Sequence, residues 1–484
     1  MAKKGGLTVV DDGTAPTPME RVEHRTVEER ASGGKAARAS VPRASHAAWQ
    51  PADDRPDPIA LLEEQATTRV QELVPIRYGR MMVSPFTFYR GAAYVMASDL
   101  ATSPRSGIRV QLCGDAHLSN FGAFATPERR LILDINDFDE TLPGPWELDV
   151  KRLAASMEVA ARDNGFAKAD RDTIVLTTVR EYRTAMRDFA AMRNLDVWYA
   201  SLDVEKIIAQ VRGQVDPKRL KLLEQSVAKA RTRDSMQAFN KLTVDVDGEP
   251  RIVSEPPLIV PIESLATDRT REDIEEELRG VLRGYRRTLE TDRRHLIEEF
   301  RFAHLAHKVV GVGSVGTRAW IILMLGRDDD DPLFLQAKEA QASVLEPSVG
   351  RSEYRNHGQR VVAGQRLMQS ASDIFLGWQR VRGLDGKERD FYIRQLRDWK
   401  FSMDVGAMVP TGLALYGGIC GWTLARAHAR SGDRVAIASY LGKGDAFDQA
   451  IATFSRAYAD QTERDHEALM DAVKKGRIKA ETGL

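Results

Sequence analysis

The sequence of 484 residues has only two cysteines, Cys113 and Cys420. So few cysteines argue against a disulfide framework and fit a reducing compartment. The sequence also has no apolar run of about 18 residues, the length that a membrane-spanning helix needs. Its first residues include no apolar stretch long enough for a signal peptide. We therefore expect a cytoplasmic protein with no membrane partner.

The sequence also lacks an excess of charge of either sign. It contains 70 basic and 70 acidic residues, so the formal net charge is zero. Proteins that bind nucleic acids usually carry a clear basic excess or a basic stripe. We therefore expect no nucleic-acid partner. Ordinary apolar and charged fractions predict a globular protein, and the length is sufficient for two to four domains or lobes.

The first part of the chain is poor in large apolar side chains. Residues 1–54 are rich in Ala, Ser, Pro, Gly, Arg and Glu. Such a segment cannot bury enough apolar surface to offset the entropy of ordering it. We interpret residues 1–54 as a disordered leader.

Helical patterns dominate residues 55–305. The stretch PIALLEEQATTRVQELV places its apolar residues on roughly one helix face, and a helical pattern also runs from Thr270 to about His307. Short strands interrupt the helices at IRVQL and RLILDIND, and the Asp247-Gly248 turn predicts a hairpin. We expect a mostly helical lobe here.

The character changes near residue 306. The segment KVVGVGSVGTRAWIILMLG and the following DDDDPLFLQAKEA predict three strands joined by a glycine loop and an acidic turn. Two further strands flank the Asp385-Gly386 turn. We expect a small antiparallel β lobe over residues 306–402, and C-terminal helices over 403–484 that pack on the helical lobe. The predicted fold class is α+β.

The segment between Cys113 and Asp149 holds the densest set of chemically useful residues. Asp115 lies where a strand gives way to a loop, and Asn120 follows five residues later. A second strand delivers Asp134 and Asp137 into another turn. Magnesium prefers oxygen ligands from carboxylates and amides. Phosphoryl transfer needs such ligands, with one further carboxylate to orient the attacking hydroxyl.

Three motifs in this segment resemble known families. CGDAHLSNFG, DINDFDET and PWELDVKRLAAS are similar to a bacterial family known as domain of unknown function 2252, over nearly the whole chain from about residue 55. More distantly, they resemble the aminoglycoside-phosphotransferase and choline-kinase branch of the kinase-like superfamily. There a catalytic loop H-G-D-x-x-x-x-N precedes a strand ending in D-F, and a helix then begins with D-L-A.

The kinase resemblance implies a role for each matching residue. Asp115 would be the catalytic base, Asn120 a catalytic-loop ligand of magnesium, and Asp137 the bridge between metal and phosphates. Asp149 would brace the catalytic loop. Asp134 stays open as the alternative metal ligand to Asp137, because an apolar run directly precedes it.

A purely structural interpretation of these acids is also open. Aspartates often cap turns or pair with surface arginines, for which Arg129, Arg130 and Arg152 are available. Cys113 stands where the related kinases have a histidine, and we expect it to be a small buried side chain. The order and spacing of the three motifs favour the metal and phosphate site.

A second group of candidates lies in the predicted β lobe. GVGSVGTR fits the pattern G-x-G-x-x-G, which alone is weak evidence. The segment that follows looks like a strand, whereas a dinucleotide-binding unit needs a helix there. A glycine loop between antiparallel strands is the kinase arrangement, in which the loop covers the nucleotide phosphates. The candidate loop residues are Gly311, Gly313, Ser314 and Gly316.

Lys338 lies near the end of the third predicted strand, where kinases keep their phosphate-binding lysine. Kinases pair this lysine with a glutamate, for which Glu353 is the best candidate and Glu346 the next. The alternative is a plain hairpin with a solvated lysine. Arg90, in FTFYRGAAY, is a candidate either for phosphate binding or for a structural role at a helix start.

The order of these elements differs from that of ordinary kinases, in which the glycine loop precedes the catalytic loop. Here the glycine loop comes later, and no lysine occurs between Lys35 and Lys151 to offer an earlier candidate. We therefore expect a circularly permuted, protein-kinase-like two-lobe fold. Leu413–Arg430 would form the helix that normally precedes the catalytic loop.

The expected function is an ATP- and Mg²⁺-dependent phosphotransferase that acts on an unknown small-molecule or protein hydroxyl. Nucleotidyl transfer is a related possibility. A catalytically silent nucleotide-binding regulator and a metal-dependent phosphohydrolase stay open as alternatives.

Overall fold

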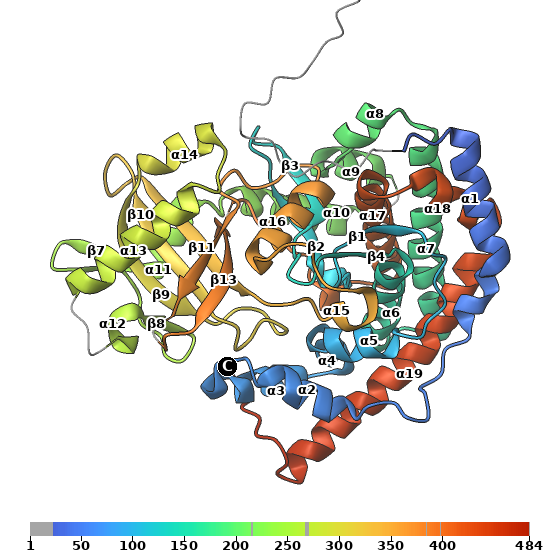
Figure 1. The fold of residues 1–484 in the computed structure, drawn as a ribbon, viewed down its shortest axis with the longest axis horizontal. Coiled ribbons are helices and arrows are strands. Elements are labelled where there is room, and N and C mark those ends of the chain that lie inside the picture. Colours follow the sequence, from blue (N-terminus) through green and yellow to red (C-terminus); the bar gives the residue numbers. More distant parts are fainter. Residues whose placement is uncertain (1–22, 214–215, 267–270, 384, 397, 484) are drawn as a thin grey trace, which may run out of the picture.

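A six-stranded antiparallel sheet occupies one side of the molecule (Figure 1). The computed structural model describes residues 23–213, 216–266, 271–383, 385–396 and 398–483. The strand order is β12-β13-β11-β10-β9-β8. The bounds are β8 (Ile259–Pro261), β9 (Arg301–Lys308), β10 (Ala319–Leu325), β11 (Pro332–Ala340), β12 (Gly377–Arg382) and β13 (Glu388–Gln395).

Helices cover both faces of this sheet, which explains why every residue of the central strand β11 is buried. On one face, α13 (Arg271–Arg286) and α14 (Thr291–Glu298) pack on β-strand side chains through Tyr285 and Ile297. On the other face, α11 (Ser235–Leu242) packs against an apolar group that includes Phe334 of β11. Helix α16 (His357–Met368) contacts β12 and β13.

Packed helices form the other side of the molecule (Figure 1). These are α6 (Glu147–Asp163), α7 (Lys168–Ala191), α17 (Pro410–Ser431), α18 (Arg434–Leu441) and α19 (Ala446–Lys474). Helix α6 lies at the centre and is buried on all sides from Glu147 to Ala161. Helices α7 and α17 approach each other closely at Gly417 and Gly421, where an added Cβ would lie 2.2 Å from Thr178 atoms.

Short strands join the two sides. Strand β1 (Arg109–Leu112) pairs with β4 (Leu142–Pro145), and β2 (Phe121–Ala125) pairs with β3 (Leu131–Ile135), which also pairs with β5 (Leu202–Asp203). The segment after β13 meets β2 through an antiparallel bridge between Ala123 and Phe401. The catalytic-loop candidates therefore lie directly beside the β lobe.

The remaining elements complete the chain. They are α1 (Val27–Ser40), η1 (Arg43–Ala47), α2 (Pro58–Ala66), η2 (Gln71–Leu73), α3 (Val74–Met81), α4 (Pro85–Gly91), α5 (Ala93–Asp99), η3 (Leu118–Asn120), α8 (Asn194–Tyr199), α9 (Val204–Val211), α10 (Pro217–Arg231), β6 (Thr243–Val246), β7 (Glu249–Ile252), α12 (Ile262–Leu265), α15 (Glu346–Val349) and η4 (Val405–Ala407). Strands β6 and β7 form the hairpin predicted around Asp247-Gly248.

The α+β class and four of the five strands predicted after residue 306 are confirmed, as β10 to β13. The first predicted strand, which begins at Lys308, is wrong, because β9 ends at that residue and a loop follows. Two boundaries also differ from the prediction. The sheet begins earlier than residue 306, because β8 precedes that residue and β9 begins at Arg301. The predicted helix up to His307 is wrong at its end: α14 stops at Glu298 and β9 begins at Arg301.

The prediction of a disordered leader is wrong for the part of it that the structure describes as α1 and η1, while residues 1–22 lie outside the described residues. Thr26 and Glu29 form a capping box at the start of α1. The helix lies against α18 (Figure 1), and Arg30 pairs with Asp433 at 2.9 Å. Small residues on α1 allow this close packing without large apolar side chains. Within the described residues, no helix is long and apolar enough to cross a membrane.

Candidate functional site

A cavity of about 390 Å³ brings the two predicted groups of residues together. The segment from Asp115 to Glu140, the glycine loop and the helices α2, α4 and α5 all contribute to its lining. The sequence candidates that line it are Asp115, Asn120, Asp137, Gly311, Gly313 and Ser314, and further lining residues include His117, Asp139, Glu140 and Arg90. Gly316 is not among the lining residues.

Lys338 reaches this cavity from behind, through two of its lining carboxylates. Its Nζ lies 2.9 Å from Asp139 Oδ2 and 3.6 Å from Asp137 Oδ2, and the residue is only 4% exposed. Burial alone would lower the pKa of Lys338, but the two carboxylates raise it above the ordinary value. Lys338 is therefore a charged group held beside Asp137 and Asp139. The fold brings Lys338 and Asp139 together although they are 199 residues apart in sequence.

Asp137 and Asn120 present oxygen atoms to the same cavity. Asp137 Oδ1 accepts a hydrogen bond from the Asp139 backbone N–H at 3.0 Å. Burial would raise the pKa of Asp137, but Lys338 and this N–H lower it, so the group is a carboxylate. The amide nitrogen of Asn120 donates to the Asp115 carbonyl at 2.8 Å, which leaves its amide oxygen for another partner.

An arginine holds Asp115 in place. Arg152 of α6 donates from Nε to Asp115 Oδ1 at 2.8 Å, and its guanidinium lies over the Tyr89 ring at 3.9 Å. Arg152 is one of the arginines considered as surface partners, but it is buried. The Nε2 of His117 lies 3.8 Å from Asp115 Oδ2, and burial lowers the pKa of His117 to about 3. His117 is therefore neutral near pH 7.

Asp149 braces the loop that begins at Cys113. Its two oxygens accept the backbone N–H groups of Cys113 at 2.8 Å and Gly114 at 3.0 Å, and His428 Nε2 lies 3.2 Å away. Gly114 has φ +86°, and an added Cβ would lie 2.3 Å from the Glu140 carbonyl oxygen. Only glycine fits this turn. Cys113 is buried, as predicted.

The structure places Asp134 outside the cavity. It forms a buried ion pair with Arg426 of α17 and accepts two hydrogen bonds at 2.9 Å from the backbone and hydroxyl of Ser370. Both members of the pair are only 1% exposed. The proposed alternative of Asp134 as metal ligand therefore loses its geometric basis, because this carboxylate already has a full set of partners.

Glu353 does not pair with Lys338. It is exposed, whereas the lysine is buried between two aspartates, so the expected glutamate partner is corrected to Asp137 and Asp139. Helix α16 instead directs Arg360 towards this segment. Arg360 donates to the carbonyl oxygens of Asp139 at 2.8 Å and Thr141 at 2.6 Å.

The glycine loop rests on the N-terminal helices. The Gly316 carbonyl accepts from Val70 N at 2.8 Å, Gly311 O accepts from Arg80 at 2.5 Å, and Arg69 donates to Val315 O at 2.5 Å. Gly311 and Gly316 have φ of +68° and +85°, which favour glycine. Gly316 thus shapes the loop from outside the cavity.

Sequence reasoning missed Asp139 as a lysine partner and missed Arg360, and it considered Arg152 only as a surface partner of the acids. Asp139 had a signal, since it follows the D-F pair directly. The other two act across long separations that no local pattern reveals.

Among the described residues, no group of three or more His, Cys, Asp and Glu side chains is arranged to hold a metal ion. Magnesium is commonly bound by one or two carboxylates together with substrate phosphates. The free amide oxygen of Asn120 and the carboxylate of Asp137 fit such a partial site.

Comparison with known proteins gives one positive result. Neither a curated protein nor a solved structure matches the chain. A family model described as "Uncharacterized protein conserved in bacteria (DUF2252)" matches residues 69–472, which include every residue of the cavity described above except Glu64, Gln65, Thr67 and Thr68. The chain therefore belongs to the bacterial DUF2252 family.

Proposed function

We propose that the protein is an ATP- and Mg²⁺-dependent phosphotransferase with a circularly permuted, kinase-like two-lobe fold, and that it acts on a small-molecule or protein hydroxyl. One observation carries the proposal. Lys338, on the third strand around the glycine loop, lies 3.6 Å from Asp137, which shares a cavity with Asp115, Asn120 and that loop. A kinase site needs this combination of groups around one triphosphate.

The chain path supports the permutation. Strands β9, β10 and β11 are followed by helix α16, strands β12 and β13, and then α17, which is the kinase order from glycine loop to the helix before the catalytic loop. Residues near the two ends also meet: Arg477 pairs with Asp57 at 2.7 Å, and Glu481 N donates to Pro75 O at 2.9 Å. Rearranged chain order is tolerated when such segments are neighbours.

Asn120 and Asp137 would hold the magnesium ion, with nucleotide phosphates as its other ligands. When bound, the ion neutralises phosphate charge. Asp115, fixed by Arg152, would orient the acceptor hydroxyl towards the phosphorus and accept its proton. Lys338 would exchange Asp139 for a phosphate oxygen, because a phosphate carries more negative charge than one carboxylate.

We place the nucleotide in the 390 Å³ cavity. It would not extend over the face of the six-stranded sheet on which Lys338 lies. Residues of β11 alternate between its faces, so Phe334 lies on the same face as Lys338. Helix α11 covers Phe334 together with Ile321 and Leu323 of β10. The base would therefore lie among the polar and aromatic side chains of the cavity, such as Tyr94 and Gln341.

The test is ATP turnover by the full-length protein with Mg²⁺, compared with Asp137→Asn, Asp115→Asn and Lys338→Met. We expect each variant to lower turnover by about 100-fold or more, as removal of a charge-stabilising group does. Asp115→Asn should keep nucleotide binding, measured by calorimetry. Asp196→Asn, which changes an exposed ion pair with Arg193 outside both cavities, is the matched control. Turnover that survives Asp137→Asn would contradict the proposal.

A silent nucleotide-binding regulator is the second candidate, and one observation favours it. Arg152 already occupies one carboxylate oxygen of Asp115, which leaves this side chain fewer acceptor positions for a substrate hydroxyl. Nucleotide binding without turnover in the parent protein would select this function. Hydrolysis of a phosphate monoester in the absence of nucleotide would select the phosphohydrolase instead.

A further inference from the structure

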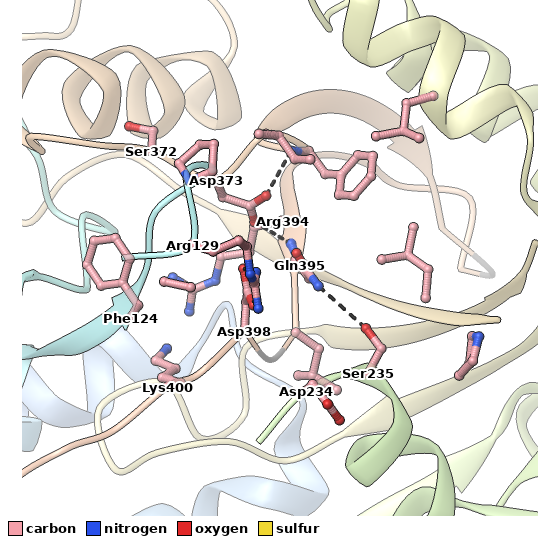
Figure 2. A pocket seen from close by; sticks show the side chains of 18 of the residues that line it. Phe124, Arg129, Asp234, Ser235, Ser372, Asp373, Arg394, Gln395, Asp398 and Lys400 are labelled. Carbon is pink, nitrogen blue, oxygen red and sulfur yellow. Dashed lines mark hydrogen bonds and ion pairs between the residues drawn. The ribbon is translucent and has the colours of Figure 1, made fainter. Parts of the chain in front are cut away.

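A second cavity, of about 490 Å³, lies between β2, the start of α11, the segment after α16 and the segment after β13 (Figure 2). It adjoins the first cavity, because Asn136 lines the second and its neighbour Asp137 lines the first. Apolar side chains, including Phe124 and Phe375, form part of its lining. The proposed phosphotransfer chemistry uses none of its residues.

Among the residues that the structure describes, two cations line this cavity and form no ion pair with a carboxylate. Arg394 donates only to neutral acceptors among the described residues: the Asn136 carbonyl at 3.1 Å and Gln336 Oε1 at 3.4 Å. For the Lys400 ammonium, the described residues provide no hydrogen bond or ion pair. Figure 2 shows both side chains in the same cavity. Like charges held close together without a counter-ion are unfavourable.

The charges that act on Lys400 reflect this arrangement. Arg394, then burial and Lys338, lower the pKa of Lys400 to about 7, and Asp137 and Asp139 oppose the shift without cancelling it. An ordinary lysine is fully charged at pH 7, whereas the surroundings of Lys400 disfavour its charge. A bound anion would restore its charge.

Five carboxylates also line the second cavity: Asp234, Asp330, Asp331, Asp373 and Asp398. Asp373 accepts the backbone N–H groups of Phe375 at 2.8 Å and Gln395 at 2.5 Å. Asp398 pairs with Arg129 at 2.7 Å, and Asp234 caps α11 through Gln237 N at 2.9 Å. Only Asp398 has a cationic partner here, and Asp373 helps to raise the pKa of Arg394. Among the described residues, however, none of these carboxylates forms an ion pair with Arg394 or Lys400.

We propose that the second cavity is a phosphate-binding site in which Arg394 and Lys400 hold the oxygens of one phosphate group. A phosphate carries about 1.5 to 2 negative charges near pH 7, which matches two cations better than a carboxylate does. Arginine supplies a directional fork of donors and lysine a point charge. The phosphate comes either from a free phosphorylated small molecule or from the tail of a nucleotide whose other end lies at Asp137.

The first experiment measures binding of inorganic phosphate to the full-length protein by calorimetry, without nucleotide. We expect Lys400→Met and Arg394→Gln each to weaken binding by about tenfold or more, since each removes a charge-assisted contact. Lys387→Met, which removes an exposed lysine of the β12–β13 turn, should bind like the parent. Equal binding by the parent, Lys400→Met and Arg394→Gln would overturn the site.

A second measurement needs no variant. After reductive ¹³C-methylation of lysines, the Lys400 resonance should titrate near pH 7 and should shift to higher pH when phosphate is added. The groups that face it are Arg394, Lys338, Asp137 and Asp139. A Lys400 titration that phosphate does not move, in a protein that binds phosphate, would also overturn the site.

Two further arms identify the source of the phosphate. If Lys338→Met abolishes ATP binding but leaves phosphate binding unchanged, the site takes a separate phosphorylated molecule. If Lys400→Met weakens ATP binding and inorganic phosphate competes with ATP, the site takes the nucleotide tail. Because the phosphate titrations contain no ATP, absence of ATP turnover would count against the proposed phosphotransferase and not against this site.

Discussion

His46 is a buried histidine far from either cavity. It lies in η1, packs edge-on against Phe447 of α19, and its Nε2 lies 2.7 Å from the Tyr440 hydroxyl. Burial, and then the nearby Lys151, lower the pKa of His46 from 6.5 to about 3. The native protein therefore keeps this ring neutral at pH values where an unfolded chain would charge it.

This histidine makes stability depend on pH. The unfolded chain binds a proton below pH 6.5 and the native state does so only near pH 3, so stability is complete above pH 6.5 and falls as the pH decreases. His46→Gln should reduce the loss of unfolding free energy between pH 7 and pH 5 by about 2 kcal/mol. Urea denaturation at both pH values measures it. His24→Gln, at an exposed histidine, is the control. If His46→Gln shows the same pH dependence of stability as the parent protein, the expectation is contradicted.

At the same scale, the sequence identified residues that its local spacing connects. Three of these residues, Asp115, Asn120 and Asp137, follow strand ends within one motif, and all three line the cavity. Asp149 lies at the predicted helix start and accepts the backbone N–H of Cys113. The prediction that Glu353 pairs with Lys338 was wrong, because the partner of the lysine depends on which side chains the fold directs towards it. That direction is a property of packing, which a single sequence does not reveal.

Helices α7 and α17 cross where glycines remove side chains from the contact. An added Cβ at Gly421 would lie 2.2 Å from the Thr178 backbone oxygen, which cannot move without shifting α7. At Gly418 the nearest atom would be Glu181 Cγ at 3.2 Å, the part of a flexible side chain. An added methyl group should therefore destabilise the protein more at Gly421 than at Gly418, although both glycines belong to α17.

Gly421→Ala should destabilise the protein by about 1–3 kcal/mol, because overpacking forces the helices apart. Gly418→Ala is the matched control. It should be neutral or stabilising by up to about 1 kcal/mol, since alanine favours the helix more than glycine does. Chemical denaturation measures both variants. Equal effects of the two substitutions would show that the crossing does not depend on the Gly421 contact.

Element types were predictable where the pattern was long and had clear turns. The hairpin at Asp247-Gly248 and the strands around Asp385-Gly386 are examples. Strand β9 was mistaken for the end of a helix, because Phe302 and Leu305 are spaced as on a helix face. Pairing with β10 decides its conformation, and such pairing overrides local spacing.

At the scale of the whole molecule, α1 closes the outer side of the helical assembly. Gly34 faces α18 so closely that an added Cβ would lie 2.1 Å from the Ala436 carbonyl oxygen, whereas nothing lies within 4 Å of one added at Gly33. The composition of residues 1–54 predicted disorder, because this segment has few large apolar side chains. Composition does not show how closely the backbone of a helix can pack on its neighbour. Docking of α1 through small residues gives no compositional signal.

Gly34→Ala should therefore lower the unfolding free energy by about 1–3 kcal/mol, and Gly33→Ala should leave it equal or slightly higher. Thermal unfolding of the two variants provides the comparison. Protease cleavage within α1 should also be faster in Gly34→Ala, since a displaced helix opens locally. If both variants unfold like the parent, α1 does not contribute to global stability.

The ion pair between Lys338 and Asp139 joins segments 199 residues apart in sequence. Ribosomes add about 5–20 residues per second, so Lys338 is synthesised about 10–40 s after Asp139. Throughout that interval a nascent chain carries the acidic half of the cavity without the cation that neutralises it. Whatever chemistry this cavity performs thus begins only after translation has passed the β lobe.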